Sequence, residues 1–151
     1  MLAQVGGAPE RRVEMDLDFV GVSWIAVIAA TVAGIVVGFV WYAPQVFGRR
    51  WATAAGIELP QPGQVQPTTY VAAIVIALVT AYVLTVLISG VGATKLVDGA
   101  IVGFLAWLGF VAPWLGSGVF FERRPTEWWL INAGQALVSL VVMGAIIGYL
   151  A

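Results

Sequence analysis

The chain has 151 residues, of which 61% are hydrophobic and 10% are charged, and its net charge is −1. Soluble proteins carry about 25% charged residues, so this composition argues against a water-soluble fold. The sequence contains no cysteine and no histidine, which excludes disulfides, thiol chemistry and the usual ligands of haem, zinc and copper. It also has no basic tail, and we therefore expect no nucleic-acid partner, no metal and no cofactor.

Residues 1–18 precede the first long apolar stretch. This segment becomes acidic toward its end, whereas a cleavable signal peptide begins with basic residues and continues into a short apolar core. Met15 stands directly before the first apolar stretch, so residues 1–14 are either a native extension or the product of an upstream start. We expect residues 1–18 to be a flexible extension.

Four stretches without any charged residue make up most of the remaining chain. They are Phe19–Gly48, Leu59–Thr94, Gly99–Phe121 and Trp128–Ala151. Each can cross a hydrocarbon core of about 30 Å, which takes roughly 20 apolar residues in a helix. The predicted fold class is therefore all-α, a polytopic membrane protein whose four transmembrane helices occupy residues 19–151. The predicted spans are residues 19–42, 68–89, 97–120 and 127–149.

Prolines mark the ends and the interruptions of these spans. Pro44 follows the first span, and the linker before the second span contains three prolines within Leu59–Pro67. Proline disfavours helix at its own position and at the preceding one, so this linker should be extended. Pro113 and Gly116 are expected to interrupt the third span.

Small residues recur at intervals of four in all the spans. Such ladders let helices approach closely, and van der Waals packing then replaces the hydrophobic drive that lipid cancels. The candidate packing residues are Ala30, Gly34, Gly38, Ala77, Ala81, Gly99, Gly103, Gly144 and Gly148. Their contacts lie within one bundle or between subunits, and four ladders leave room for both.

The ends of the first and third spans share one order of residues. Gly-Phe-Val, Pro, Val-Phe, Arg-Arg and Trp occur within residues 38–51 and again within residues 109–128. Both copies follow an odd-numbered span, which predicts two parallel helical hairpins related by a pseudo-twofold axis along the membrane normal. Alternatively, these residue types simply gather at cytoplasmic helix ends.

Two arginine pairs lie in the loops after these spans. They are Arg49 with Arg50 and Arg123 with Arg124. The positive-inside rule places both loops in the cytoplasm and both termini outside, in a bacterial inner membrane. The arginines either set this topology alone or also bind a lipid headgroup, because paired guanidinium groups suit a phosphate.

Aromatic and polar side chains near the same side are candidates for a pocket. The candidate residues are Trp41, Tyr42, Trp114, Asn132, Gln135 and Ser139. The aromatic members, together with Trp51, Tyr70, Trp128 and Trp129 on the same side, form either an interfacial belt or the walls of a pocket that opens to the cytoplasm. The polar members either bond across helices or line a solute path. No ionisable residue lies in the middle of a span, so a proton-coupled or voltage-sensing machine lacks its usual parts.

Several segments resemble a bacterial four-helix membrane family that is catalogued as domain of unknown function 1761. They are Gly38–Pro44, Phe47–Arg49 with Trp51, Phe120–Pro125, Ile131–Gly134 and Met143–Ile146. The resemblance covers residues 19–151 and is most specific in the second half. It implies four spans with short loops, and it supplies no activity and no catalytic residues. Gln135 stands where the family's Asn-x-Gly-Tyr pattern has a tyrosine.

We expect an integral membrane protein without enzymatic activity, which associates with itself or joins a larger membrane complex and contacts membrane lipids. Short loops, small-residue ladders and the lack of a catalytic constellation favour this function. The alternative is a small transporter or channel for a neutral or lipid-like solute, which the repeat and the proline kinks favour. A membrane enzyme would depend on Glu122 and Glu127, the carboxylates nearest to one another in a loop.

Overall fold

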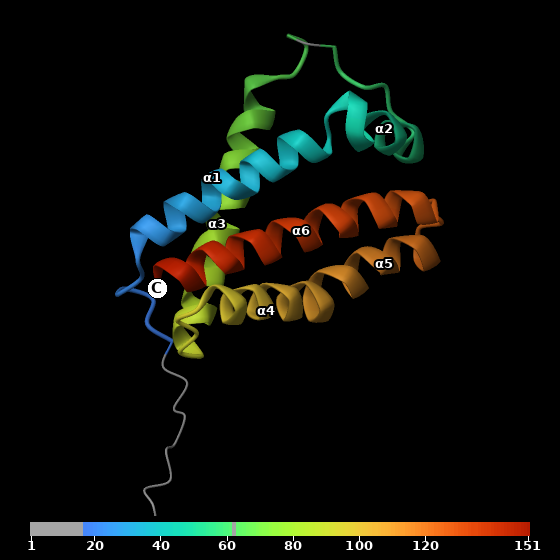
Figure 1. Cartoon of the computed structure of the whole chain (residues 1–151). Coiled ribbons are helices and arrows are strands. Elements are labelled where there is room, and N and C mark those ends of the chain that lie inside the picture. Colours follow the sequence, from blue (N-terminus) through green and yellow to red (C-terminus); the bar gives the residue numbers. More distant parts are fainter. Residues whose placement is uncertain (1–16, 62) are drawn as a thin grey trace, which may run out of the picture.

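A computed structural model describes residues 17–61 and 63–151 (Figure 1). Over these residues the protein is helical and contains no strand. Four of its helical stretches are long and apolar enough to cross a membrane, and they are Trp24–Trp41, Pro67–Gly90, Leu96–Phe121 and Thr126–Leu150. The predicted all-α class and the four spans are therefore confirmed. The predicted flexibility of the N-terminal segment falls on residues 1–16, which lie outside the described part.

Eight helical elements follow one another within residues 17–61 and 63–151. They are α1 (Trp24–Trp41), the π-helical turn η1 (Pro44–Gly48), α2 (Arg49–Ala55), α3 (Pro67–Gly90), α4 (Leu96–Ala106), the π-helical turn η2 (Trp107–Val111), α5 (Ala112–Phe121) and α6 (Thr126–Leu150). The third span consists of α4, η2 and α5.

Local sequence explains where these helices begin and end. The hydroxyl of Ser23 accepts a hydrogen bond from the backbone N–H of Ala26 at 3.4 Å and caps the start of α1. Pro67 begins α3, where its missing N–H would have had no helical partner. Gly56 ends α2 with a φ of 69°, a left-handed conformation that glycine adopts without a steric penalty.

The third span continues through Pro113. A proline ring clashes with the carbonyl four residues earlier in an α-helix. Here the preceding turn is π-helical, and the N–H of Ala112 donates to the carbonyl of Trp107, five residues back. The wider turn relieves the clash, so the predicted interruption at Pro113 takes the form of η2, and Gly116 lies inside α5.

The segment before α1 is also ordered. Oδ1 of Asp18 accepts hydrogen bonds from the backbone N–H groups of Val20 and Gly21, both at 2.8 Å. The N–H of Gly21 and then that of Val20 lower the pKa of Asp18 below its ordinary value of 3.8. The hydroxyl of Tyr82 in α3 donates to the carbonyl of Phe19 at 2.7 Å, which attaches this turn to the bundle.

Helix α6 occupies the centre, between α1 on one side and α4–α5 on the other (Figure 1). Its closest neighbour is α4, and the contact depends on glycines. A Cβ atom on Gly99 would collide with the backbone carbonyl of Gly144, and one on Gly103 would collide with that of Leu140. A Cβ atom on Gly148 would likewise collide with the backbone carbonyl of Lys95. The ladders of these two helices therefore pack against each other within one bundle.

Helices α1 and α3 run antiparallel and contact each other through small and aromatic residues. Ala30 and Ala81 are fully buried. The ring of Trp24 stacks on that of Tyr82 with 6.0 Å between centroids. At the opposite end of the pair the rings of Phe39 and Tyr70 also stack, with 6.2 Å between centroids. The predicted equivalence of the two hairpins stays a prediction.

The two arginine loops lie at the same end of the bundle, where α2 approaches the beginning of α6 (Figure 1). Nε of Arg50 in α2 is 2.6 Å from Oε1 of Glu127 in α6. We call this side, with Arg49, Arg50, Arg123 and Arg124, the arginine end.

The surface of the spans is apolar. Ile25 on α1 is 75% exposed and Phe110 on the third span is 77% exposed. A contiguous apolar surface of this kind is unfavourable in water, whereas lipid solvates it, and helices satisfy their backbone polar groups internally, as a bilayer requires. The protein is a multi-pass membrane protein.

Candidate functional site

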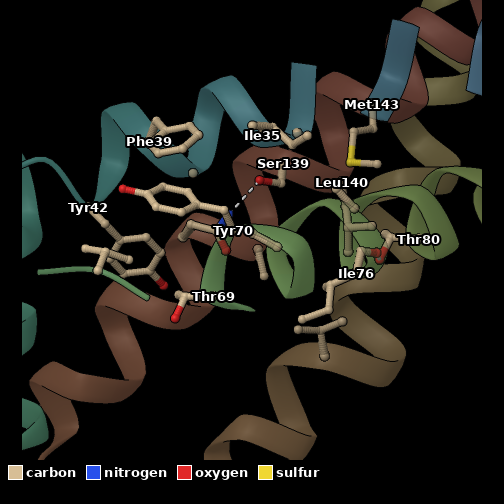
Figure 2. Close-up of a pocket in the computed structure, with 18 residues that line it drawn as sticks. Ile35, Phe39, Tyr42, Thr69, Tyr70, Ile76, Thr80, Ser139, Leu140 and Met143 are labelled. Atoms are coloured by element: carbon tan, nitrogen blue, oxygen red, sulfur yellow. Dashed lines mark hydrogen bonds between the residues drawn. The ribbon is translucent and has the colours of Figure 1, made fainter. Parts of the chain in front are cut away.

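A cavity of about 610 Å³ lies among α1, α3 and α6 (Figure 2). Ligand pockets in proteins commonly measure about 300–1,000 Å³, so this space has the size of a binding site. Four elements contribute to its lining. They supply Gly34, Ile35, Gly38 and Phe39 from α1 with Tyr42 just after it; Val65 just before α3 with Thr69, Tyr70, Ala73, Ile76, Ala77 and Thr80 from α3; Val111 from η2; and Gln135, Ala136, Ser139, Leu140 and Met143 from α6. We call it the α1–α3–α6 cavity.

The cavity exists because small residues face each other where α1 and α3 separate. Ala30 and Ala81 are fully buried where these helices touch. One turn closer to the arginine end, Gly34 and Ala77 border the cavity instead, and Gly38 continues the series on α1. A Cβ atom on Gly38 would meet only Nε2 of Gln135, at 3.9 Å, so no neighbouring backbone fills this position.

Polar groups gather in the half of the cavity that lies toward the arginine end (Figure 2). Tyr42, Thr69 and Tyr70 line it there. Gln135 and Ser139 face it from α6, and Nε2 of Gln135 donates to Oγ of Ser139 at 2.8 Å. Because residues four apart lie on one helix face, α6 presents this amide and hydroxyl together.

A hydrogen-bonded chain fixes Tyr42 at this polar half. Its hydroxyl donates to Oδ1 of Asn132 at 2.9 Å, and Nδ2 of Asn132 donates to the carbonyl of Trp128 at 2.7 Å. The ring of Trp51 meets the Tyr42 ring edge-on, with centroids 5.3 Å apart. The buried Nε1 of Trp51 has no hydrogen-bond partner among the described residues.

The opposite half of the cavity is apolar. Ile35, Ile76, Leu140 and Met143 line it (Figure 2). The hydroxyl of Thr80 also faces this half, but it donates to the carbonyl of Ile76 at 2.8 Å and is therefore satisfied within its own helix. A ligand in this half would meet hydrocarbon and a thioether.

No charged side chain from the described part of the chain lines the cavity. Nor do these residues contain a group of His, Cys, Asp or Glu that could hold a metal ion. Both ion pairs among the described residues lie outside the cavity at the arginine end, where Nε of Arg124 is 2.6 Å from Oε2 of Glu122. The guanidinium of Arg124 also lies 4.5 Å from the centroid of the Trp128 ring, a cation–π contact.

The sequence match covers this whole arrangement. A family profile described as "Protein of unknown function (DUF1761)" matches residues 25–148. The chain belongs to the DUF1761 family. Every residue that lines the α1–α3–α6 cavity falls inside the matched region of DUF1761. No curated protein and no solved structure matches the chain.

In this DUF1761 protein, three of the predicted pocket residues line the cavity: Tyr42, Gln135 and Ser139. Asn132 is absent from the lining but orients Tyr42. Nε1 of Trp41 donates to the carbonyl of Ile131 at 3.0 Å, so this indole connects α1 to α6.

The sixth predicted pocket residue, Trp114, lies elsewhere. Its side chain belongs to α5, is 78% exposed and does not line the cavity. The third span instead approaches the cavity through Val111. Exposure of an indole on the outside of a spanning helix agrees with the interfacial-belt interpretation of the aromatic residues.

The four predicted headgroup arginines all lie at the arginine end, in two different environments. Arg50 and Arg124 form the ion pairs with Glu127 and Glu122. Arg49 and Arg123 form no ion pair with the described residues, although all four arginines are exposed, and Arg123 has a φ of 56°. Exposed ion pairs contribute little stability, typically about 0–1 kcal/mol, so these contacts orient side chains more than they hold the fold.

Little of the contribution of α3 was identified from the sequence. Thr69, Tyr70 and Ala73 line the cavity, and of these only Tyr70 belongs to the aromatic residues that the sequence suggested as pocket walls. Its signal was the ladder that contains Ala77 and Ala81, which predicts close packing along the whole helix. The structure uses one end of that ladder for packing and the other end to border the cavity.

Proposed function

We propose that this protein is a non-enzymatic membrane protein that binds a neutral, lipid-like solute in the α1–α3–α6 cavity and carries it between the bilayer and the arginine end. The observation that carries the proposal is a cavity of about 610 Å³ with an apolar half and a polar half. Membrane-embedded sites that are apolar with a few convergent polar groups suit small ligands.

Charge supports the neutral character of this solute. A carboxylate or ammonium group in the cavity would lose its hydration without gaining a counter-ion, because no charged side chain from the described residues lines it. The carboxylates that an enzyme would need, Glu122 and Glu127, are paired with arginines outside the cavity. Their engagement supports a binding role over a hydrolytic one.

The orientation of the site follows from the arginines. The positive-inside rule favours a cytoplasmic arginine end, which puts both termini on the outer side of a bacterial inner membrane. In that orientation the polar half of the cavity lies toward the cytoplasmic leaflet and the apolar half toward the bilayer centre.

The test is native mass spectrometry of protein extracted in a gentle detergent. Wild-type protein should retain a neutral lipid-like adduct, and Gly38→Phe should lose it, because that side chain would project into the cavity. Gly109→Phe is the matched control, since nothing lies within 4 Å of a Cβ atom there. If wild type and Gly38→Phe carry the same adducts, the cavity is not the binding site.

A second candidate is a self-associating subunit of a homo-oligomer or larger complex. The specific observation in its favour is that Gly34, Gly38 and Ala77 border open space, and small residues of this kind admit a neighbouring helix in lipid. The same measurement separates the two functions. Oligomeric wild-type protein without a lipid adduct, converted to a monomer by Gly38→Phe, would support self-association and exclude solute binding.

A further inference from the structure

The polar half of the α1–α3–α6 cavity has unused hydrogen-bonding capacity of both kinds. Nε2 of Gln135 donates one bond, to Oγ of Ser139. Oε1 of Gln135 accepts no hydrogen bond from the described residues, and the Ser139 hydroxyl proton has no acceptor among them. An amide oxygen is an acceptor and a serine hydroxyl is also a donor, so the pair offers one free acceptor beside one free donor.

Two other polar groups of the lining differ in this respect. The Tyr42 hydroxyl already donates to Asn132, and the Thr80 hydroxyl donates to the carbonyl of Ile76. Among the lining residues of α6, Gln135 and Ser139 together can therefore accept one hydrogen bond from a ligand and donate one to it. Ser139 lies between Tyr70 of the polar half and Leu140 of the apolar half (Figure 2), and Gln135 is one helical turn before it in α6.

We infer that the ligand is a single-chain amphiphile with a hydroxyl head, which donates to Oε1 of Gln135 and accepts from Ser139 while its hydrocarbon chain extends toward Met143. This inference rests on the proposed function, since it names the ligand class of the same cavity. A hydroxyl has one donor and two acceptor positions, so it satisfies both members of the pair. An ether or ester oxygen accepts only and leaves Oε1 of Gln135 without a partner.

The rest of the cavity fits this orientation. Ile35, Ile76 and Leu140 surround the chain, and Met143, which is 2% exposed, closes the space against Gly34, where its sulfur would lie 2.9 Å from an added Cβ atom. A carboxylate head is disfavoured because the cavity lining from the described residues carries no positive charge. The ligand is thus an alcohol and not a fatty acid.

The experiment measures binding of four matched probes to detergent-purified full-length protein by native mass spectrometry: hexadecanol, its methyl ether, hexadecanoate and hexadecane. We expect hexadecanol to bind about tenfold more tightly than the ether, the effect of one unmet hydrogen bond. Gln135→Leu should reduce that ratio to about one without weakening the binding of hexadecane. Ser139→Ala removes a donor that both oxygens can use, so it should weaken hexadecanol and the ether alike. Ser117→Ala is the control and should keep the full preference and affinity, because the Ser117 hydroxyl donates to the carbonyl of Trp114 outside the cavity.

The outcomes separate the inference from the function on which it rests. Equal binding of hexadecanol and the ether, a preference that survives Gln135→Leu, unchanged binding of hexadecanol by Ser139→Ala, or tightest binding of hexadecanoate would overturn the hydroxyl assignment while the cavity remains a binding site. If none of the four probes binds in the cavity, or if Gly38→Phe binds all four as wild type does, the proposed function itself is wrong.

Discussion

The hydroxyl of Tyr42 lies 2.9 Å from Oδ1 of Asn132 and donates a hydrogen bond to it. These residues are 90 positions apart in the sequence, and their bond joins the end of α1 to the first third of α6. It also turns the Tyr42 ring toward the α1–α3–α6 cavity. One polar pair therefore fixes both the packing of two spans and one wall of the site.

Tyr42→Phe should weaken the bundle moderately. The substitution removes this hydrogen bond and keeps the ring against Trp51, so we expect a loss of about 0.6–2 kcal/mol, the range for hydrogen bonds between helices in membranes. Equilibrium unfolding in mixed micelles measures it. Tyr149→Phe is the control, because Tyr149 is 73% exposed and should change stability negligibly. An unchanged unfolding midpoint for Tyr42→Phe would contradict the assigned role.

Gly103→Ala should destabilise the protein strongly, by about 1–3 kcal/mol or more. The added methyl group would collide with the carbonyl of Leu140 and force α4 away from α6. Gly109→Ala makes the same chemical change where nothing lies within 4 Å. Because alanine favours helix over glycine by about 1 kcal/mol, this control should be neutral or slightly stabilising. Thermal unfolding of both variants measures this: the midpoint should fall for Gly103→Ala and should stay the same or rise slightly for Gly109→Ala.

Two tryptophans should respond differently to replacement by phenylalanine. Nε1 of Trp107 donates to the carbonyl of Ala133 at 2.7 Å, so Trp107→Phe should cost about 0.5–1.5 kcal/mol for the lost bond. Nε1 of Trp51 is buried without a partner among the described residues, so Trp51→Phe removes an unsatisfied donor. We expect the second variant to unfold at a higher denaturant concentration than the first, and the reverse order would refute this difference.

Acid should release the turn that precedes α1. Backbone N–H groups of Gly21 and Val20 stabilise the carboxylate of Asp18, so its pKa in the folded protein lies below 3.8. The contribution to stability is therefore fully present above the unfolded-state pKa and is lost as the pH falls through the folded-state pKa. A carboxyl-carbon NMR titration should give a midpoint below 3.8, and Asp18→Asn should abolish the pH dependence of the Gly21 amide signal. A midpoint at or above the ordinary value would contradict the turn.

The spans could be predicted from the sequence because a long uncharged stretch has few alternatives to a transmembrane helix. The predicted first and fourth spans, residues 19–42 and 127–149, correspond to α1 and α6. The glycines of α4 and α6 were also recognisable, since their spacing of four places them on one face.

The cavity could not be predicted in the same way. The ladders of α1 and α3 have the same pattern as those of α4 and α6, and only the three-dimensional path of α3 decides that Ala81 packs while Ala77 borders open space. The polar members Gln135 and Ser139 were identifiable because polar side chains in a span need partners. Tyr70 was identifiable only as one of several aromatic residues near the arginine end. Thr69 was not identifiable, because a threonine at the start of a helix near the interface is common in proteins without a site there.

Photo-crosslinking from Tyr70 tests the central claim most directly. A benzophenone amino acid replaces either Tyr70, which lines the cavity, or Tyr149, which is exposed at the end of α6 that lies away from the arginine end. Each protein is irradiated in native membranes, and the crosslinked products are identified by mass spectrometry. We predict that position 70 captures one discrete neutral amphiphile, whereas position 149 captures bulk phospholipid. Capture of the same bulk lipids at both positions, or of a second copy of the chain at position 70, would contradict a solute-binding cavity.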